Sequence, residues 1–190
     1  MPLEVAATDI PDVLLVRSEL LRDDRGGFLE SFRHSVLAAH GANVRVAQVN
    51  ESISQAKVLR GMHYQLEPHG QGKLVRVLRG AALDVAVDVR SGSPWFGQYV
   101  ALELSAENRN LLWIPAGFAH GFCALEDDTH FLYVQTTEYA PASEAGVNAF
   151  DPALELPWPF PQGEMILSDK DLQLPPLSSA RLNFDYREKP

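Results

Sequence analysis

The stretch VLRGMHYQ, residues Val58–Gln65, decides how the rest of the chain is interpreted. Val58, Met62 and Tyr64 favour an extended backbone or pack well on a sheet, so the stretch predicts a strand. His63 stands among these apolar residues, and a polar side chain buried there needs a hydrogen-bond partner or a function. Because imidazole titrates near neutral pH, three roles are open: proton acceptor, metal ligand, or buried hydrogen-bonded group.

The spacing of Arg60 and His63 predicts a local distortion of this strand. In a regular strand these two side chains point to opposite faces. They can share a pocket only if the strand bulges, and Gly61 is the position where a bulge costs least. We therefore predict an irregularity at Gly61.

Size and composition predict one globular domain, residues 1–190, with 46% hydrophobic and 22% charged residues. The net charge of −9 argues against nucleic acid or an anionic membrane as partner. An anionic ligand would therefore need a local cluster of Arg and Lys.

A single cysteine, Cys123, excludes an intrachain disulfide, and the N-terminus shows no signal sequence. No apolar stretch reaches the ~20 residues of a spanning helix. We expect a soluble, cytoplasmic protein.

Short strands separated by turns predict a mainly β fold, an antiparallel sandwich or barrel. The expected strands cover residues 13–17, 28–32, 44–50, 58–65, 73–78, 82–89, 98–104, 111–114, 120–125 and 131–137. Short helices are expected at 35–40 and after Ser168, a typical N-cap. Residues 141–190 are rich in proline and are expected to wrap around the sheets. An up-and-down barrel or a jelly roll would leave a mouth for a ligand.

Two further strand residues have both a structural and a functional interpretation. Lys73 shares a face with Val75 and Val77, which places a cation at the end of an apolar row. It is either a solvated edge lysine or a pocket residue. Tyr133 is either an ordinary core aromatic or a pocket residue.

The histidines do not follow the pattern of a metal-dependent β-barrel enzyme. Such sites usually have two histidines two positions apart, but Gln65 stands two positions after His63, and the chain has no His-x-His. His120, enclosed in GFAHGF, is a candidate for the site or for a structural role. The other histidines are expected at the surface: His34, His40, His69 and His130.

Nine segments of the sequence, spread over nearly the whole chain, together resemble the dTDP-4-dehydrorhamnose 3,5-epimerase family. The segments that carry the resemblance are DDRGGFLESF, QVNESIS, VLRGMHYQ, GQGKLVRVLRG, LDVAVDVRSGSPWFG, LSAENRNLLWIPAGFAHGF, FLY, YAPASE and LSDKD. The resemblance implies an antiparallel jelly roll, the cupin-like double-stranded β-helix, with few helices. It also implies a homodimer that uses no metal and no other cofactor.

The substrate implied by the resemblance is dTDP-4-dehydro-6-deoxy-D-glucose, a dTDP-4-keto-6-deoxy sugar. Its carbons 3 and 5 adjoin a ketone, so each can lose a proton to form an enolate. By resemblance, His63 is the base, Asp171 its hydrogen-bond acceptor, Tyr133 the acid on the opposite face, and Lys73 the group that stabilises the enolate oxygen.

The resemblance also assigns a set of substrate-binding positions. They are Arg25, Glu30, Gln48, Asn50, Arg60, His120, Glu144 and Lys170. In relatives the early strand that carries the first two extends the partner's sheet, so Arg25 and Glu30 are expected to serve the neighbouring subunit's site. The cations of this set, with Lys73, would supply the attraction that a diphosphate needs from an acidic protein.

Two positions depart from the family pattern: Val134 stands where many relatives have lysine, and Trp95 where threonine is usual. Val134 should face away from Tyr133 by strand parity. Three alternatives remain beside the 3,5-epimerase: a mono-epimerase that inverts carbon 3 or carbon 5, a metal-dependent cupin enzyme, and a non-catalytic sugar-binding jelly roll.

Overall fold

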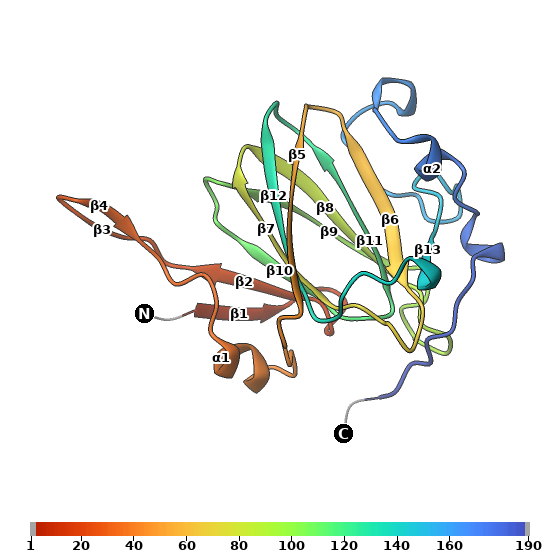
Figure 1. The fold of residues 1–190 in the computed structure, drawn as a ribbon, viewed down its shortest axis with the longest axis horizontal. Helices are drawn as coiled ribbons and strands as arrows, with labels where there is room; N and C mark the ends of the chain where they lie inside the picture. The colour runs from red at the N-terminus through yellow and green to blue at the C-terminus, as the bar shows by residue number, and fades with distance from the viewer. Residues whose placement is uncertain (1–2, 189–190) are drawn as a thin grey trace.

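Two antiparallel β-sheets face each other in the computed structural model, which describes residues 3–188 (Figure 1). The larger sheet has the strand order β1 (Leu3–Ala7), β2 (Leu14–Ser18), β10 (Leu111–Ile114), β7 (Lys73–Arg79), β12 (Thr129–Gln135) and β5 (Gln48–Ser54). The smaller sheet has the order β13 (Glu144–Gly146), β6 (Leu59–Gln65), β11 (Phe118–Ala124), β8 (Ala81–Asp88) and β9 (Tyr99–Ser105). A hairpin of β3 (Leu21–Asp23) and β4 (Gly26–Phe28) extends away from both sheets (Figure 1).

The order of the strands identifies a jelly roll. From β5 to β8, and again from β9 to β12, the chain crosses from one sheet to the other with every strand. In an up-and-down barrel, by contrast, each strand would pair with the next along the chain. The mainly β, antiparallel jelly roll is therefore confirmed, and the up-and-down alternative is wrong.

Short helices and irregular chain pack around the two sheets. The helices are α1 (His34–Ala39) and α2 (Asp169–Leu172), with 3₁₀ turns at Pro141–Ser143, Gln162–Glu164 and Leu177–Ser179. Leu37 of α1 is buried in a cluster with Leu74 and Leu111 on the outside of the larger sheet. The segment after β13 lies along the outside of the smaller sheet, where Phe184 and Leu59 belong to one cluster. Residues 189–190, the end of the expected wrapping segment, lie outside the described residues.

Several element boundaries differ from the prediction. Strands β1, β3 and β13 were not predicted, and all three are short pairings at the margin of the fold. The strand expected at 28–32 lies at Gly26–Phe28, because the turn is confined to Asp24 and Arg25. The strand expected at 44–50 lies at Gln48–Ser54, four residues later. The helix after Ser168 is confirmed, with the Ser168 hydroxyl accepting a hydrogen bond from the backbone N–H of Asp171.

The inner faces of the sheets form the main core. Val75 and Val77 of β7 are fully buried there with Phe122 and Phe131, whose rings stack with centroids 4.1 Å apart. The core fills one part of the space between the sheets, and a cavity lined by both polar and apolar side chains occupies another part.

A bulge interrupts β6 at the predicted position. His63 pairs with His120 and Arg60 pairs with Phe122, so Gly61 and Met62 together lie opposite the single residue Gly121. The extra residue turns both Arg60 and His63 toward the same cavity. The predicted irregularity is confirmed.

Gly61→Ala is expected to lower the free energy of unfolding by about 3 kcal/mol. Gly61 has φ +135°, and a Cβ there would lie 2.5 Å from Cα of Gly121 and 2.9 Å from the carbonyl oxygen of His120. Urea unfolding monitored by circular dichroism measures the loss. Gly92→Ala is the matched control: Gly92 has φ +76° with nothing within 4 Å of its Cβ position, so ~1 kcal/mol is expected. Equal losses in the two variants would mean that the bulge does not require a glycine.

Candidate active site

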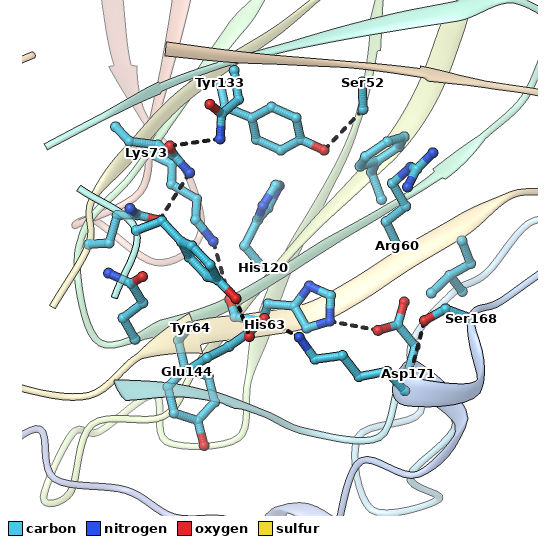
Figure 2. Close-up of a pocket in the computed structure, with 18 of the residues that line it drawn as sticks. Ser52, Arg60, His63, Tyr64, Lys73, His120, Tyr133, Glu144, Ser168 and Asp171 are labelled. Atoms are coloured by element: carbon cyan, nitrogen blue, oxygen red, sulfur yellow. Dashed lines mark hydrogen bonds and ion pairs between the residues drawn. The ribbon is translucent and has the colours of Figure 1, made fainter. Parts of the chain in front are cut away.

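A cavity of about 920 Å³ lies between the two sheets, and both sheets contribute to its walls. His63, from β6, comes from the smaller sheet, and Tyr133, from β12, comes from the larger one. Figure 2 shows the two side chains on opposite sides of the cavity, with His120 and Lys73 between them. Ser168 and Asp171 close one side from α2 and its N-cap.

His63 forms a close polar pair with Asp171 in the cavity. Nε2 of His63 lies 2.7 Å from Oδ1 of Asp171. Burial favours the neutral form of Asp171, but the His63 ring, the Gly61 N–H and the Ser168 hydroxyl outweigh it and hold the pKa of Asp171 below its usual value. The carboxylate therefore accepts a hydrogen bond from the Nε2–H of His63, which leaves Nδ1 as the ring nitrogen with a free lone pair.

Lys73 is a buried cation directly beside this pair. Its Nζ donates a hydrogen bond to the carbonyl oxygen of His63 at 3.2 Å. Burial lowers the pKa of Lys73 to about 8, against the opposing charges of Asp84 and Glu144. At neutral pH Lys73 is thus still mostly protonated, and it is poorly solvated. Such a charge stabilises an anion more strongly than an exposed lysine does.

Tyr133 faces this group from the other wall. Burial raises the pKa of its phenol to about 12, although the Ser52 hydroxyl and the charge of Arg60 act in the opposite direction. The hydroxyls of Tyr133 and Ser52 are 3.3 Å apart. Tyr133 therefore keeps its proton at neutral pH and can act as a donor. Val134 packs in a different cluster on the outer face, which confirms that it faces away from Tyr133.

His120 lies deeper in the cavity and is held by a buried carboxylate. Its Nε2 is 2.8 Å from Oδ2 of Asp84, and both residues are buried. Burial lowers the pKa of His120, with the charges of Lys73 and His63 adding to the effect and Asp84 opposing it. His120 is therefore a neutral ring at pH 7, able to exchange hydrogen bonds with a ligand through Nδ1.

At the mouth, Glu144 joins Tyr139 and Lys170. The Tyr139 hydroxyl donates to Glu144 at 2.7 Å, and Nζ of Lys170 is 2.6 Å from the other carboxylate oxygen. Burial opposes ionisation of Glu144, but these two partners lower its pKa. The carboxylate thus fixes an aromatic ring and a cation at the entrance.

Most of the predicted site residues line one cavity. These are His63, Lys73, Asp171, Tyr133, Asn50, Arg60, His120, Glu144 and Lys170. Gln48 is not a lining residue, but it contacts two residues that are, through its hydrogen bonds to Asn50 and to the backbone N–H of Tyr139.

Arg25 and Glu30 do not line the cavity of their own chain. Arg25, at the tip of the β3–β4 hairpin, is highly exposed and paired with Asp23, while Glu30 is paired with Arg33. The β3–β4 hairpin, whose turn carries Arg25, extends away from the sheets (Figure 1). The expectation that both serve a neighbouring subunit stays a prediction.

Several lining residues were not predicted as site residues. Ser52, Gln71, Gln135, Tyr139 and Ser168 contribute polar or aromatic groups to the cavity. One signal in the sequence could have identified two of them: Ser52 shares a strand face with Asn50, and Gln135 with Tyr133.

The remaining histidines, which were expected at the surface, are exposed or partly buried. His34, His40 and His69 are exposed. His130 is partly buried between Glu51 and Asp128, 2.7 and 3.3 Å away. In residues 3–188, no three side chains of His, Cys, Asp or Glu converge in a way that could hold a metal ion. No helix of this range is long and apolar enough to cross a lipid bilayer.

A proton acceptor and a proton donor that face each other across one cavity can remove a proton from one side of a carbon and return one to the other side. A buried cation near them can hold the negative charge that develops between the two steps. The fold and the site thus define an isomerase of the epimerase type.

Comparison with known proteins identifies the family. The family model for dTDP-4-dehydrorhamnose 3,5-epimerase matches residues 7–179, and the chain belongs to this family. The dTDP-4-dehydrorhamnose 3,5-epimerase of Shigella flexneri is 47% identical over 171 residues, 90% of this chain and 93% of that protein. The crystal structure of the 3,5-epimerase RmlC from Legionella pneumophila, in complex with dTDP-4-keto-L-rhamnose, superimposes with a TM-score of 0.93. It is 40% identical, and the match covers 98% of this chain and 100% of that one.

A relative with a narrower activity is also similar. ChmJ from Streptomyces bikiniensis, a 3′-monoepimerase crystallised with dTDP-quinovose, is 38% identical, with a TM-score of 0.85. The match covers 91% of this chain and 87% of ChmJ. The Shigella 3,5-epimerase is thus more similar in sequence than this mono-epimerase.

Proposed function

We propose that this chain converts dTDP-4-dehydro-6-deoxy-D-glucose to dTDP-4-dehydro-L-rhamnose by inverting carbons 3 and 5. The observation that carries the proposal is the placement of His63, paired with Asp171, and Tyr133 on opposite walls of one cavity. Inversion needs a base on one face of the carbon and an acid on the other, and a pair on one wall would return the proton to the same face.

The reaction begins with loss of a proton next to the ketone. Nδ1 of His63 takes the proton from carbon 3 or carbon 5, and the C–H electron pair moves into the enolate at carbon 4. Asp171 stabilises the imidazolium through its hydrogen bond to Nε2. Lys73 stabilises the negative enolate oxygen from its buried position, where its charge is weakly screened.

Tyr133 completes the inversion from the other wall. Its phenol gives a proton to the opposite face of the carbanion, and the enolate electrons return to re-form the ketone. His63 then releases its proton and Tyr133 recovers one from water, so the enzyme is ready for the second carbon. No redox change occurs, and the sequence of steps requires no cofactor.

Binding of the dTDP moiety and the sugar falls to the remaining polar groups. We assign Arg60, His120, Asn50, Glu144 and Lys170 to substrate binding in the cavity that they line. Gln48 supports this group through Asn50. The cations offset the −9 net charge of the chain at the point where a diphosphate would bind.

The proposal includes a homodimer in the cytoplasm. Arg25 and Glu30 would then reach the site of the neighbouring subunit, because the hairpin that ends just before Glu30 extends from the body of the chain (Figure 1). Its side chains Leu21 and Phe28 are 42% and 66% exposed, which is unusual for neighbouring apolar residues outside an interface. The free thiol of Cys123 fits a reducing compartment.

Solvent exchange in deuterated water tests the proposal and separates it from the mono-epimerase. We expect the keto-sugar nucleotide incubated with the enzyme to gain deuterium at carbon 3 and at carbon 5, as measured by NMR of the product. Exchange at one carbon alone would identify a mono-epimerase. Exchange at neither would reject both functions. Heat-inactivated enzyme is the control, because protons next to a ketone also exchange slowly without catalysis.

A further inference from the structure

Four side-chain amides form one continuous hydrogen-bonded chain along the wall of the cavity. Nε2 of Gln48 donates to Oδ1 of Asn50 at 3.0 Å, and Nδ2 of Asn50 donates to Oε1 of Gln135 at 3.2 Å. Nε2 of Gln135 then donates to Oε1 of Gln71 at 3.0 Å. The four side chains come from β5, the end of β12 and the loop before β7.

Main-chain groups fix both ends of this amide chain. The carbonyl oxygen of Thr137 accepts from Nε2 of Gln71 at 2.6 Å, and the backbone N–H of Tyr139 donates to Oε1 of Gln48 at 2.8 Å. A carbonyl can only accept and an N–H can only donate, so neither end can be reversed. The two ends independently require the same direction, and turning all four amides over would create a mismatch at each end.

The direction of the chain determines what Asn50 presents to a ligand. Its oxygen accepts from Gln48 and one of its two N–H groups donates to Gln135, so the second N–H is the donor that remains for the cavity. Gln71 and Gln135 are buried, at 9% and 8% exposure, and cannot exchange these bonds readily with water. They are well placed to hold the amide of Asn50 in one orientation.

We propose that Gln71 and Gln135 are positioning residues for ligand binding, which turn the amide of Asn50 so that an N–H faces an acceptor oxygen of the bound sugar nucleotide. The inference rests on the proposed function for the identity of the ligand. These two residues take no part in the proton transfers. They make one point of the cavity selective for a ligand oxygen that accepts a hydrogen bond. An amide free to rotate would present its own oxygen half of the time, and two acceptors repel.

Gln65 provides an internal comparison. Its Nε2 donates to the carbonyl oxygens of His69 and Glu138, and its Oε1 accepts from the N–H of Ala140. Both N–H groups of Gln65 are thus used within the protein. Gln65 fixes the backbone on either side of Tyr139. Gln135 and Asn50, by contrast, each have one amide N–H that is not used in the amide chain.

Gln135→Met tests the proposal, because methionine has a similar length and cannot form either hydrogen bond. We expect about a tenfold increase in KM and in the Kd of dTDP-glucose, the size of one hydrogen bond to the ligand, with kcat changed less than about twofold. Gln98→Met is the matched control: Gln98 is exposed and does not line the cavity, so both constants should match the wild type. Calorimetry with dTDP-glucose, which lacks the ketone, measures binding separately from turnover.

A double-mutant cycle with Asn50→Ala distinguishes positioning from a general structural role. If Gln135 acts through Asn50, Gln135→Met has no further effect on Kd once Asn50 is alanine. A full additional loss in that background would overturn the proposal, and so would an unchanged Kd in the single variant. Wild-type enzyme that binds dTDP-glucose but does not exchange deuterium would contradict the proposed function alone, since the amide chain would still be tested by binding.

Discussion

His63→Asn is expected to reduce turnover of the keto-sugar nucleotide by about 10²–10⁴-fold, with deuterium exchange lost at both carbons. In the proposed mechanism one imidazole serves both positions, so the two exchange rates should fall together. Asparagine can still donate a hydrogen bond to Asp171, but it has no nitrogen lone pair that could take a proton. Single-turnover assays followed by NMR measure both rates.

His69→Asn is the matched control for this experiment. His69 is an exposed histidine in the turn after β6, and its hydrogen bonds use main-chain atoms. The substitution should leave both exchange rates unchanged. Retention of dTDP-glucose binding by His63→Asn would show that the cavity is intact. Turnover near the wild-type level in His63→Asn would refute the assignment of the base.

The local distortion at the centre of the site could be predicted from the sequence, because it follows from strand parity. Arg60 and His63 are three residues apart, so a common cavity requires a bulge between them, and Gly61 is the residue that permits one. The same reasoning placed Lys73 on a face with Val75 and Val77. In the structure these three residues are buried, and Lys73 is a pocket residue rather than a solvated one.

Strand β5 was misplaced for a physical reason. Its cavity side carries the polar residues Asn50 and Ser52, whereas the apolar Ile53 at an alternate position is 59% exposed. This is the reverse of the usual apolar-in, polar-out pattern on which sequence interpretation depends. This polar face made the strand difficult to recognise in the sequence, and the same face contributes side chains to the amide chain.

Pairings between distant parts of the chain could not be predicted from pattern. His63 and Asp171 are 108 residues apart, and the sequence between them contains no periodicity that relates them. Only the family resemblance suggested the pair. Asp84, the partner of His120, was missed entirely, because a single buried carboxylate on an apolar strand has no distinguishing signal before the sheets are assembled.

Lys73→Met is expected to reduce turnover by about 10²–10³-fold, through loss of the charge that stabilises the enolate oxygen, while the folded protein becomes more stable. The cause of the stability gain is burial, which lowers the pKa of Lys73 from 10.5 to about 8. That difference corresponds to about 3 kcal/mol of unfavourable free energy at pH 7. The lost hydrogen bond to the His63 carbonyl offsets part of it, so a net gain of ~1–3 kcal/mol is expected.

The stability difference between the wild type and Lys73→Met is expected to depend on pH. Below pH 8 Lys73 is protonated in both the folded and the unfolded chain, and the cost of burying the charge is present in full. Between pH 8 and 10.5 the folded chain has lost this proton and the unfolded chain still binds it, so wild-type stability due to Lys73 recovers as pH rises. The stability advantage of Lys73→Met should therefore be largest at neutral pH and vanish near pH 10.5.

Activity should change over the same range in the opposite sense. As pH rises through about 8, wild-type Lys73 becomes neutral and kcat/KM should fall, while Tyr133, whose burial raises its pKa to about 12, remains protonated. Urea unfolding and initial-rate assays from about pH 6 to about pH 10 span the Lys73 pKa and measure the two trends on the same preparation.

Lys57→Met, at a partly exposed lysine paired with Glu164 away from the cavity, is the matched control and should leave kcat/KM unchanged. A Lys73→Met protein that is both less stable and fully active would contradict the assignment, because a lysine with that behaviour would be a structural residue.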